Sequence, residues 1–142
     1  MTLFKKILCI YIFFGSSSLF SGQITFSVNG VNSDKGMISA QLFYGEEDYL
    51  LGKPLQKVSL PAKKTGVIFI FPNLVNGSYG IRYFHDENSN SELETNLFGI
   101  PVEGYGFSNN AKPNFGPALY QDLQFHVEKD EDNIINDSQV IY

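Results

Sequence analysis

The sequence is poor in the residues on which many protein functions depend. It contains one cysteine, Cys9, one arginine, Arg82, two histidines and no tryptophan. Because Cys9 lies in an N-terminal apolar run, the remainder of the chain has no cysteine with which to form a disulfide. A single arginine excludes an arginine cluster that binds anions. The 15 acidic residues outnumber the 10 lysines and arginines, and this net charge of −5 argues against a nucleic-acid-binding protein.

Recognisable catalytic patterns are also missing. Ser108 lies in GFSNN and not in a G-x-S-x-G elbow, and the zinc-binding spacing H-E-x-x-H is absent. We therefore expect a protein that is not an enzyme. The alternative is a hydrolase that uses loop carboxylates together with His85, which adjoins Asp86. His85 could also join a metal site or be a hydrogen-bonded histidine of the core, which is the commoner case.

Long hydrophobic runs are absent as well. The apolar run at residues 7–14 is far shorter than the roughly 20 residues that span a membrane. It follows Lys5 and Lys6 and precedes the small residues 15–18, which is the order of a secretory signal peptide. We predict that residues 1–22 are a signal peptide, cleaved after residue 18 or 22. The domain of residues 23–142 would then lie in the periplasm or outside the cell, with no transmembrane anchor.

The rest of the chain is rich in aromatic residues, which make up 15% of the sequence, and in strand patterns. Alternating apolar and polar residues at 24–29 and 37–44, separated by turn residues, predict a hairpin. Residues 67–71 (VIFIF) are apolar on both faces, which predicts a central strand. Further strands are predicted at 55–60, 79–85, 120–127 and 134–142, and one helical turn near Tyr49. About seven strands predict an all-β fold, a single antiparallel β-sandwich.

One long segment, residues 86–119, has no strand pattern. Loops of this length are uncommon in compact domains and are usually functional or disordered. The segment contains several aromatic residues, so we predict an ordered loop with a functional role.

Side chains with oxygen atoms occur at alternate positions where this loop begins. Calcium prefers six to eight oxygen ligands, and a D-x-[DN]-x-[DN]-G pattern supplies several of them. The predicted calcium ligands are Asp86, Asn88, Asn90, Glu92 and Glu94. Ser91 stands where the pattern has glycine, and Leu97 stands where a closing glutamate would bind, which predicts weak affinity. The alternative is a metal-free turn capped by Asx side chains, with no cofactor.

Farther along the loop, aromatic rings alternate with glycine and asparagine. Rings of this kind stack on sugars or peptides, and amides hydrogen-bond their hydroxyls or carbonyls. The predicted ligand- or partner-binding residues are Phe98, Glu103, Tyr105, Phe107, Asn109 and Asn110. The ligand would be an envelope or extracellular carbohydrate or protein. In the alternative, the domain is purely structural and the rings, Phe115 included, cap an open end of the sandwich.

The segment from residue 84 to 120 resembles the DUF2141 family of bacterial secreted proteins. The family pattern FHDxNxNGxLDTN is matched by FHDENSNSELETN, and GxPxEGYGFSNNA by GIPVEGYGFSNNA. Ser91 replaces the usual glycine and Glu94 the usual aspartate. The resemblance implies a signal peptide and one β-rich domain, and it supplies no activity. The NGSY segment at 76–79 is similar to a turn of transthyretin-like domains, which implies a transthyretin- or immunoglobulin-like sandwich.

Overall fold

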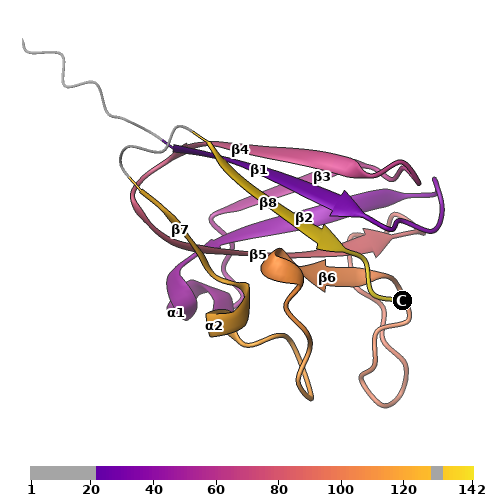
Figure 1. Cartoon of the computed structure of the whole chain (residues 1–142). Helices are drawn as coiled ribbons and strands as arrows, with labels where there is room; N and C mark the ends of the chain where they lie inside the picture. The colour runs from indigo at the N-terminus through magenta and orange to yellow at the C-terminus, as the bar shows by residue number, and fades with distance from the viewer. Residues whose placement is uncertain (1–21, 129–132) are drawn as a thin grey trace, which may run out of the picture.

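The computed structural model describes residues 22–128 and 133–142. The predicted signal peptide lies outside the described residues, apart from Gly22. The described chain forms two packed β-sheets, with the short helices α1 (Gly45–Leu50) and α2 (Tyr120–Leu123) near each other (Figure 1). The prediction of an all-β sandwich is confirmed. In the described ranges, no helix has the length and apolar character needed to cross a membrane.

The smaller sheet has three strands in the order β4–β1–β8. They are β1 (Gly22–Asn29), β4 (Val67–Leu74) and β8 (Ile134–Gln139). Every second residue of β1 is buried, as the alternating sequence predicts. β1 runs antiparallel to β4 but parallel to β8, so the sandwich is not antiparallel throughout as predicted.

The larger sheet has five strands, in the order β3–β2–β5–β6 with β7 also paired to β5. They are β2 (Met37–Tyr44), β3 (Gln56–Pro61), β5 (Gly77–Asp86), β6 (Tyr105–Phe107) and β7 (Phe125–Val127). β7 pairs with the first residues of β5 and β6 with later ones, which leaves a gap at Ile81. Ser108, in the 3-10 turn η1 (Ser108–Asn110), fills this gap, because its Oγ accepts the N–H of Ile81 at 3.0 Å.

Two apolar clusters lie on opposite faces of the larger sheet. The first is the core between the sheets, which includes Phe26, Phe69 and Ile81. The second covers the outer face of the larger sheet and consists of Phe43, Tyr49, Phe107, Ala111, Ala118, Tyr120 and Leu123, with Tyr105 packed against it. The chain that follows β5 therefore wraps around the outside of the sandwich, and it is there that the candidate site lies.

Two strand predictions near the N-terminus were wrong in their pairing. Residues 24–29 and 37–44 do form strands, but β1 and β2 belong to different sheets and make no hairpin. Both edges of β1 are taken by β4 and β8, so the turn between β1 and β2 crosses from one sheet to the other. Residues 67–71 lie in β4 at the edge of the smaller sheet, with Ile68 and Ile70 exposed.

Two predictions in the second half of the chain were also wrong in part. Residues 120–127 begin as a helix, because Tyr120 and Leu123 lie three residues apart and both bury into the outer cluster. Only Phe125–Val127 are a strand. The predicted loop 86–119 is ordered, but β6 and η1 interrupt it. The helical turn predicted near Tyr49 is confirmed as α1.

Candidate functional site

The predicted calcium residues lie in the turn that follows β5. Asp86 is buried, and its two carboxylate oxygens accept the backbone N–H groups of Asn90 at 3.0 Å and Ser91 at 2.9 Å. Asn88 Oδ1 accepts the same N–H of Asn90 at 3.0 Å, and Asn90 Oδ1 accepts that of Glu92 at 2.9 Å. The contacts of Asn88 and Asn90, each to the N–H two residues on, are Asx turns, and with those of Asp86 they hold the backbone in a tight curve.

Glu94 joins the same cluster from the far side of the turn. Its Oε1 accepts the side-chain amides of Asn88 at 2.8 Å and Asn90 at 3.2 Å. The structure thus brings together four of the five predicted ligands, whereas Glu92 takes part through its backbone N–H alone. Within the described ranges, no three His, Cys, Asp or Glu residues form a metal-binding group. Two carboxylates and two amide oxygens, each with a spare lone pair, remain compatible with a weak calcium site.

Glu103, a predicted binding residue, supports this turn from inside the fold. Its side chain is buried, and its oxygens accept the backbone N–H groups of Glu87 and Glu94, each at 3.1 Å. A carboxylate that accepts backbone N–H groups makes strong, charge-assisted hydrogen bonds. Asp86 and Glu103 therefore brace the turn from both ends.

The GYGF segment places two of the predicted aromatic residues inside the protein. Phe107 is buried in the outer cluster, and Tyr105 is half-buried against it, with its backbone paired to Ile141. A Cβ on Gly106 would collide with the ring of Tyr83, so glycine allows this ring to pack under β6. These two rings pack on the outer face of the larger sheet, whereas the structural alternative has the rings cap an open end of the sandwich.

The two asparagines of the same segment hydrogen-bond within the fold. Asn109 Nδ2 donates to the carbonyl of Gln124 at 2.7 Å, and Asn109 exchanges two hydrogen bonds with Asn136 of β8. Asn110 Oδ1 accepts the backbone N–H of Gln139 at 2.8 Å. The structure thus places Asn109 and Asn110 where they attach β8 to η1.

His85 is a fully buried residue of the core. Its Nε2 lies 2.7 Å from the carbonyl of Lys35, and because a carbonyl only accepts, Nε2 carries the proton. Nδ1 lies 2.9 Å from the hydroxyl of Tyr142, and that hydroxyl accepts the N–H of Asn32. Both ring nitrogens are occupied.

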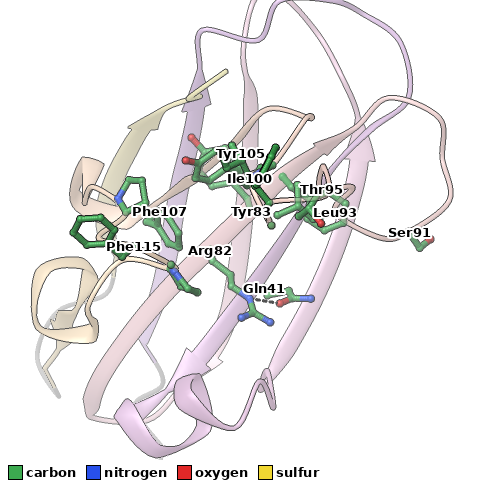
Figure 2. A pocket seen from close by; sticks show the side chains of 17 residues that line it. Gln41, Arg82, Tyr83, Ser91, Leu93, Thr95, Ile100, Tyr105, Phe107 and Phe115 are labelled. Carbon is green, nitrogen blue, oxygen red and sulfur yellow. Dashed lines mark hydrogen bonds between the residues drawn. The ribbon is translucent and has the colours of Figure 1, made fainter.

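The remaining rings, Phe98 and Phe115, are exposed, Phe98 by 88%, and they line a pocket of about 750 Å³. The floor of the pocket is the outer face of β2 and β5, and its walls are residues 91–101 and 113–117 (Figure 2). Asn96 orders the first wall, since its Oδ1 accepts the N–H groups of Phe98 at 2.9 Å and Ile100 at 3.1 Å. The predicted binding residues thus divide into a buried group and a group around an open pocket.

Arg82 lies on the floor of this pocket. Its Nε donates to Gln41 Oε1 at 2.7 Å (Figure 2). Its Cζ lies 4.8 Å from the centre of the Phe43 ring. Burial lowers the pKa of Arg82, while the nearby Tyr49 raises it. From the sequence, Arg82 served only to exclude an arginine cluster. The available signal was its place in YGIRYFH, where it is the one charged residue between aromatic and apolar neighbours.

The Asx turn, the braced GYGFSNN segment and the strands around them can be compared with known families. The model of a family described as "Uncharacterized protein conserved in bacteria (DUF2141)" matches residues 26–135. The chain belongs to the DUF2141 family. In this DUF2141 protein the matched region runs from β1 to the start of β8 and so includes the whole candidate site. No curated protein and no solved structure matches the chain, and the likeness to transthyretin-like domains stays a prediction.

Proposed function

We propose that this DUF2141 protein is a non-enzymatic binding module that takes up a small apolar molecule in the pocket on the outer face of its larger sheet. The observation that carries this proposal is the pocket of about 750 Å³ between two loop walls. This volume lies in the range of small-molecule sites, roughly 300–1,000 Å³. By the order of residues 1–22, the module works in the periplasm or outside the cell.

The exposure of Phe98 and Phe115 supports this function. Large aromatic rings exposed to solvent are unfavourable, and exposed apolar surface of this kind often marks a site that binds a ligand or another protein. Tyr105 and Phe107, in contrast, pack against the apolar cluster on the outer face of the larger sheet. Phe98 and Phe115 have no place in that cluster. The side chains of Asn109 and Asn110 are hydrogen-bonded within the fold. This favours an apolar ligand over a carbohydrate, whose hydroxyls free amide groups would bind.

Binding of a neutral fluorescent probe, N-phenyl-1-naphthylamine, tests this function. We expect saturable fluorescence enhancement with the purified protein and a severalfold weaker affinity in the double variant Phe98→Ala/Phe115→Ala. Leu97→Ala is the matched control, because Leu97 is fully exposed beside Phe98 but does not line the pocket. Equal losses in both variants, or no binding by the original protein, would contradict the proposal.

Calcium binding by the Asx turn is a second candidate function. It is favoured by the convergence of Asp86, Asn88, Asn90 and Glu94 in one hydrogen-bonded cluster. Calcium here would stiffen the wall of the pocket that begins at Ser91. We expect an affinity on the order of 0.1–1 mM, as in extracellular modules.

Calorimetric titration with calcium tests this second function. Glu94→Gln removes a carboxylate of the cluster and should abolish the heat, whereas Glu92→Gln, two residues away, should retain it. Thermal melts with calcium and with a chelator should show a higher melting temperature only when calcium is present. The absence of heat and of any shift would leave the turn as a metal-free structure.

The absence of catalysis is part of the same proposal. His85 and Asp86, which the hydrolase alternative requires, each use both polar atoms of their side chain in hydrogen bonds within the fold. A panel of ester and glycoside substrates tests this point. Turnover that disappears in Asp86→Asn would overturn it.

A further inference from the structure

The guanidinium of Arg82 makes one hydrogen bond along an edge and has one aromatic ring against a face. Gln41 takes the Nε hydrogen, and the ring of Phe43 lies against the face. No hydrogen bond joins Nη1 or Nη2 to another described residue. Within the described part of the chain, no buried side-chain nitrogen or oxygen lacks a partner, so these two groups must reach solvent. Arg82 lines the pocket and also a smaller hollow of about 340 Å³, where its Nη2 lies near Gly52.

This cation is held among apolar groups without a counter-charge. In the described ranges, no carboxylate lies within 4.0 Å of Arg82, and the sole salt-bridge contact there is His85 with Glu87. The pocket around it is lined mainly by aromatic, aliphatic and proline side chains, such as Phe107 and Phe115. A partly buried charge is costly unless it is paired. The fold thus keeps a guanidinium in place while leaving its remaining donors to a molecule from outside.

The remaining donors suit one kind of group. An arginine fork matches the two oxygens of a carboxylate, and hydrogen bonds of this type are about twice as strong as neutral ones. Gln41 and Phe43 fix the plane of the fork in advance, so little side-chain freedom is lost on binding. Arg82 and the apolar walls line the same pocket, so a ligand that contacts both must combine an anionic end with an apolar body.

We propose that the pocket binds a small carboxylate with an apolar body, whose carboxylate pairs with Nη1 and Nη2 of Arg82 while its body lies between the walls that carry Phe98 and Phe115. This inference rests on the proposed function and adds the class of ligand. Arg82 is therefore a binding residue that selects for charge, and the two phenylalanines select for apolar surface.

Displacement of N-phenyl-1-naphthylamine by octanoate and by octan-1-ol, which share an alkyl chain, tests this inference. With the original protein we expect octanoate to bind at least about tenfold more tightly than octan-1-ol, the size of one charge-assisted contact. Arg82→Gln should weaken octanoate about tenfold and leave octan-1-ol unchanged. Lys57→Gln is the matched control, since Lys57 lies in the same cross-strand row, beyond Gln41, and outside the pocket lining.

The outcomes separate the inference from the function on which it rests. Equal affinities for octanoate and octan-1-ol in the original protein would overturn the charge selection and leave the pocket a binding site, even if Arg82→Gln did not fold. Failure of the probe to bind would contradict the uptake of a neutral apolar molecule; octanoate is then titrated directly by calorimetry, and the absence of heat would overturn the inference as well. A dimer that dissociates in Phe98→Ala/Phe115→Ala would show that a second copy covers the pocket, and this would also overturn the inference.

Discussion

Arg82 and Gln41 face each other across β5 and β2, with Arg82 Nε 2.7 Å from Gln41 Oε1. The pair lies on the outer face of the larger sheet, where most small sandwiches meet solvent, and here two loop walls enclose it. Because the amide oxygen holds one edge of the guanidinium, the remaining donors point to fixed positions. A rigid binding group on a β-sheet scaffold, with aromatic walls supplied by loops, is the arrangement expected of a pre-formed site.

Ser91 takes the left-handed backbone conformation, with φ of 68°, at the place where the family pattern has glycine. This conformation costs a residue with a Cβ about 1 kcal/mol, which glycine avoids. We expect Ser91→Gly to increase the free energy of unfolding by about 0.5–1 kcal/mol in urea titrations. Ser59→Gly, within β3, is the comparison and should reduce it, because the variant gains freedom in the unfolded chain and loses the hydrogen bond to Ser39. A loss of stability in both variants would contradict the assigned backbone strain.

Gly106 lets the ring of Tyr83 lie directly under β6. That ring cannot move aside easily, because it is buried and its hydroxyl bonds Ser138 at 2.9 Å. We expect Gly106→Ala to reduce the free energy of unfolding by about 1–3 kcal/mol, the usual cost of overpacking. Gly99→Ala, with open space around the new Cβ but φ of 76°, should cost about 1 kcal/mol. The account is wrong if Gly106→Ala proves the milder of the two.

Burial raises the pKa of Tyr49 to about 12, and the charge of Arg82 opposes this rise. The folded protein therefore holds this proton more tightly than the unfolded chain, whose tyrosine titrates near pH 10. The resulting contribution to the free energy of unfolding is fully present below about pH 10 and is lost as the pH rises towards 12. Urea titrations across this window should show a shallower decline for Tyr49→Phe. Tyr44→Phe, which alters an exposed ring, should follow the original protein. Identical slopes for Tyr49→Phe and the original protein would contradict this assignment.

Gly22 is the first residue of β1, where it is buried and paired with Leu74. Cleavage after residue 22 would remove this pair, whereas cleavage after residue 18 would retain it. We therefore expect the protein purified from the envelope or medium of a bacterium that expresses the full chain to begin at Leu19, as measured by intact mass. A chain that begins at Gln23 would contradict the preference, and an uncleaved chain in the cytoplasm would contradict the signal peptide.

The sequence predicted the strands better than their partners. Alternation at Ile24, Phe26 and Val28 identified β1 and its buried face, because that pattern depends on the strand alone. It could not show that β1 pairs with β4 and β8, since sheet partners depend on residues far apart in the sequence. The prediction of a central strand at Ile68 and Ile70 was wrong for a related reason. An apolar residue on both faces indicates a central strand only where both faces are covered, and here one face is open.

The sequence predicted which segment forms the candidate site, but not how most of its side chains lie relative to one another. Asp86, Asn88, Asn90 and Glu94 do converge, because their spacing already places them around one turn. The rings of the following loop carried no comparable signal: Phe98 and Phe107 are the same residue type, yet one faces solvent and the other the sheet. Arg82 becomes important only because β2 and both loop walls surround it. All three lie outside its own strand, β5.

Chemical-shift mapping of the ¹⁵N-labelled protein during titration with octanoate tests the central claim most directly. The account predicts saturable changes at the backbone amides of residues 91–101 and 113–117 and at the Nε–H of Arg82. The opposite face, which carries Thr25 and Ile70, should remain unchanged. Changes confined to that face, or none at all at concentrations where octanoate is monomeric, would show that the pocket is not the binding site.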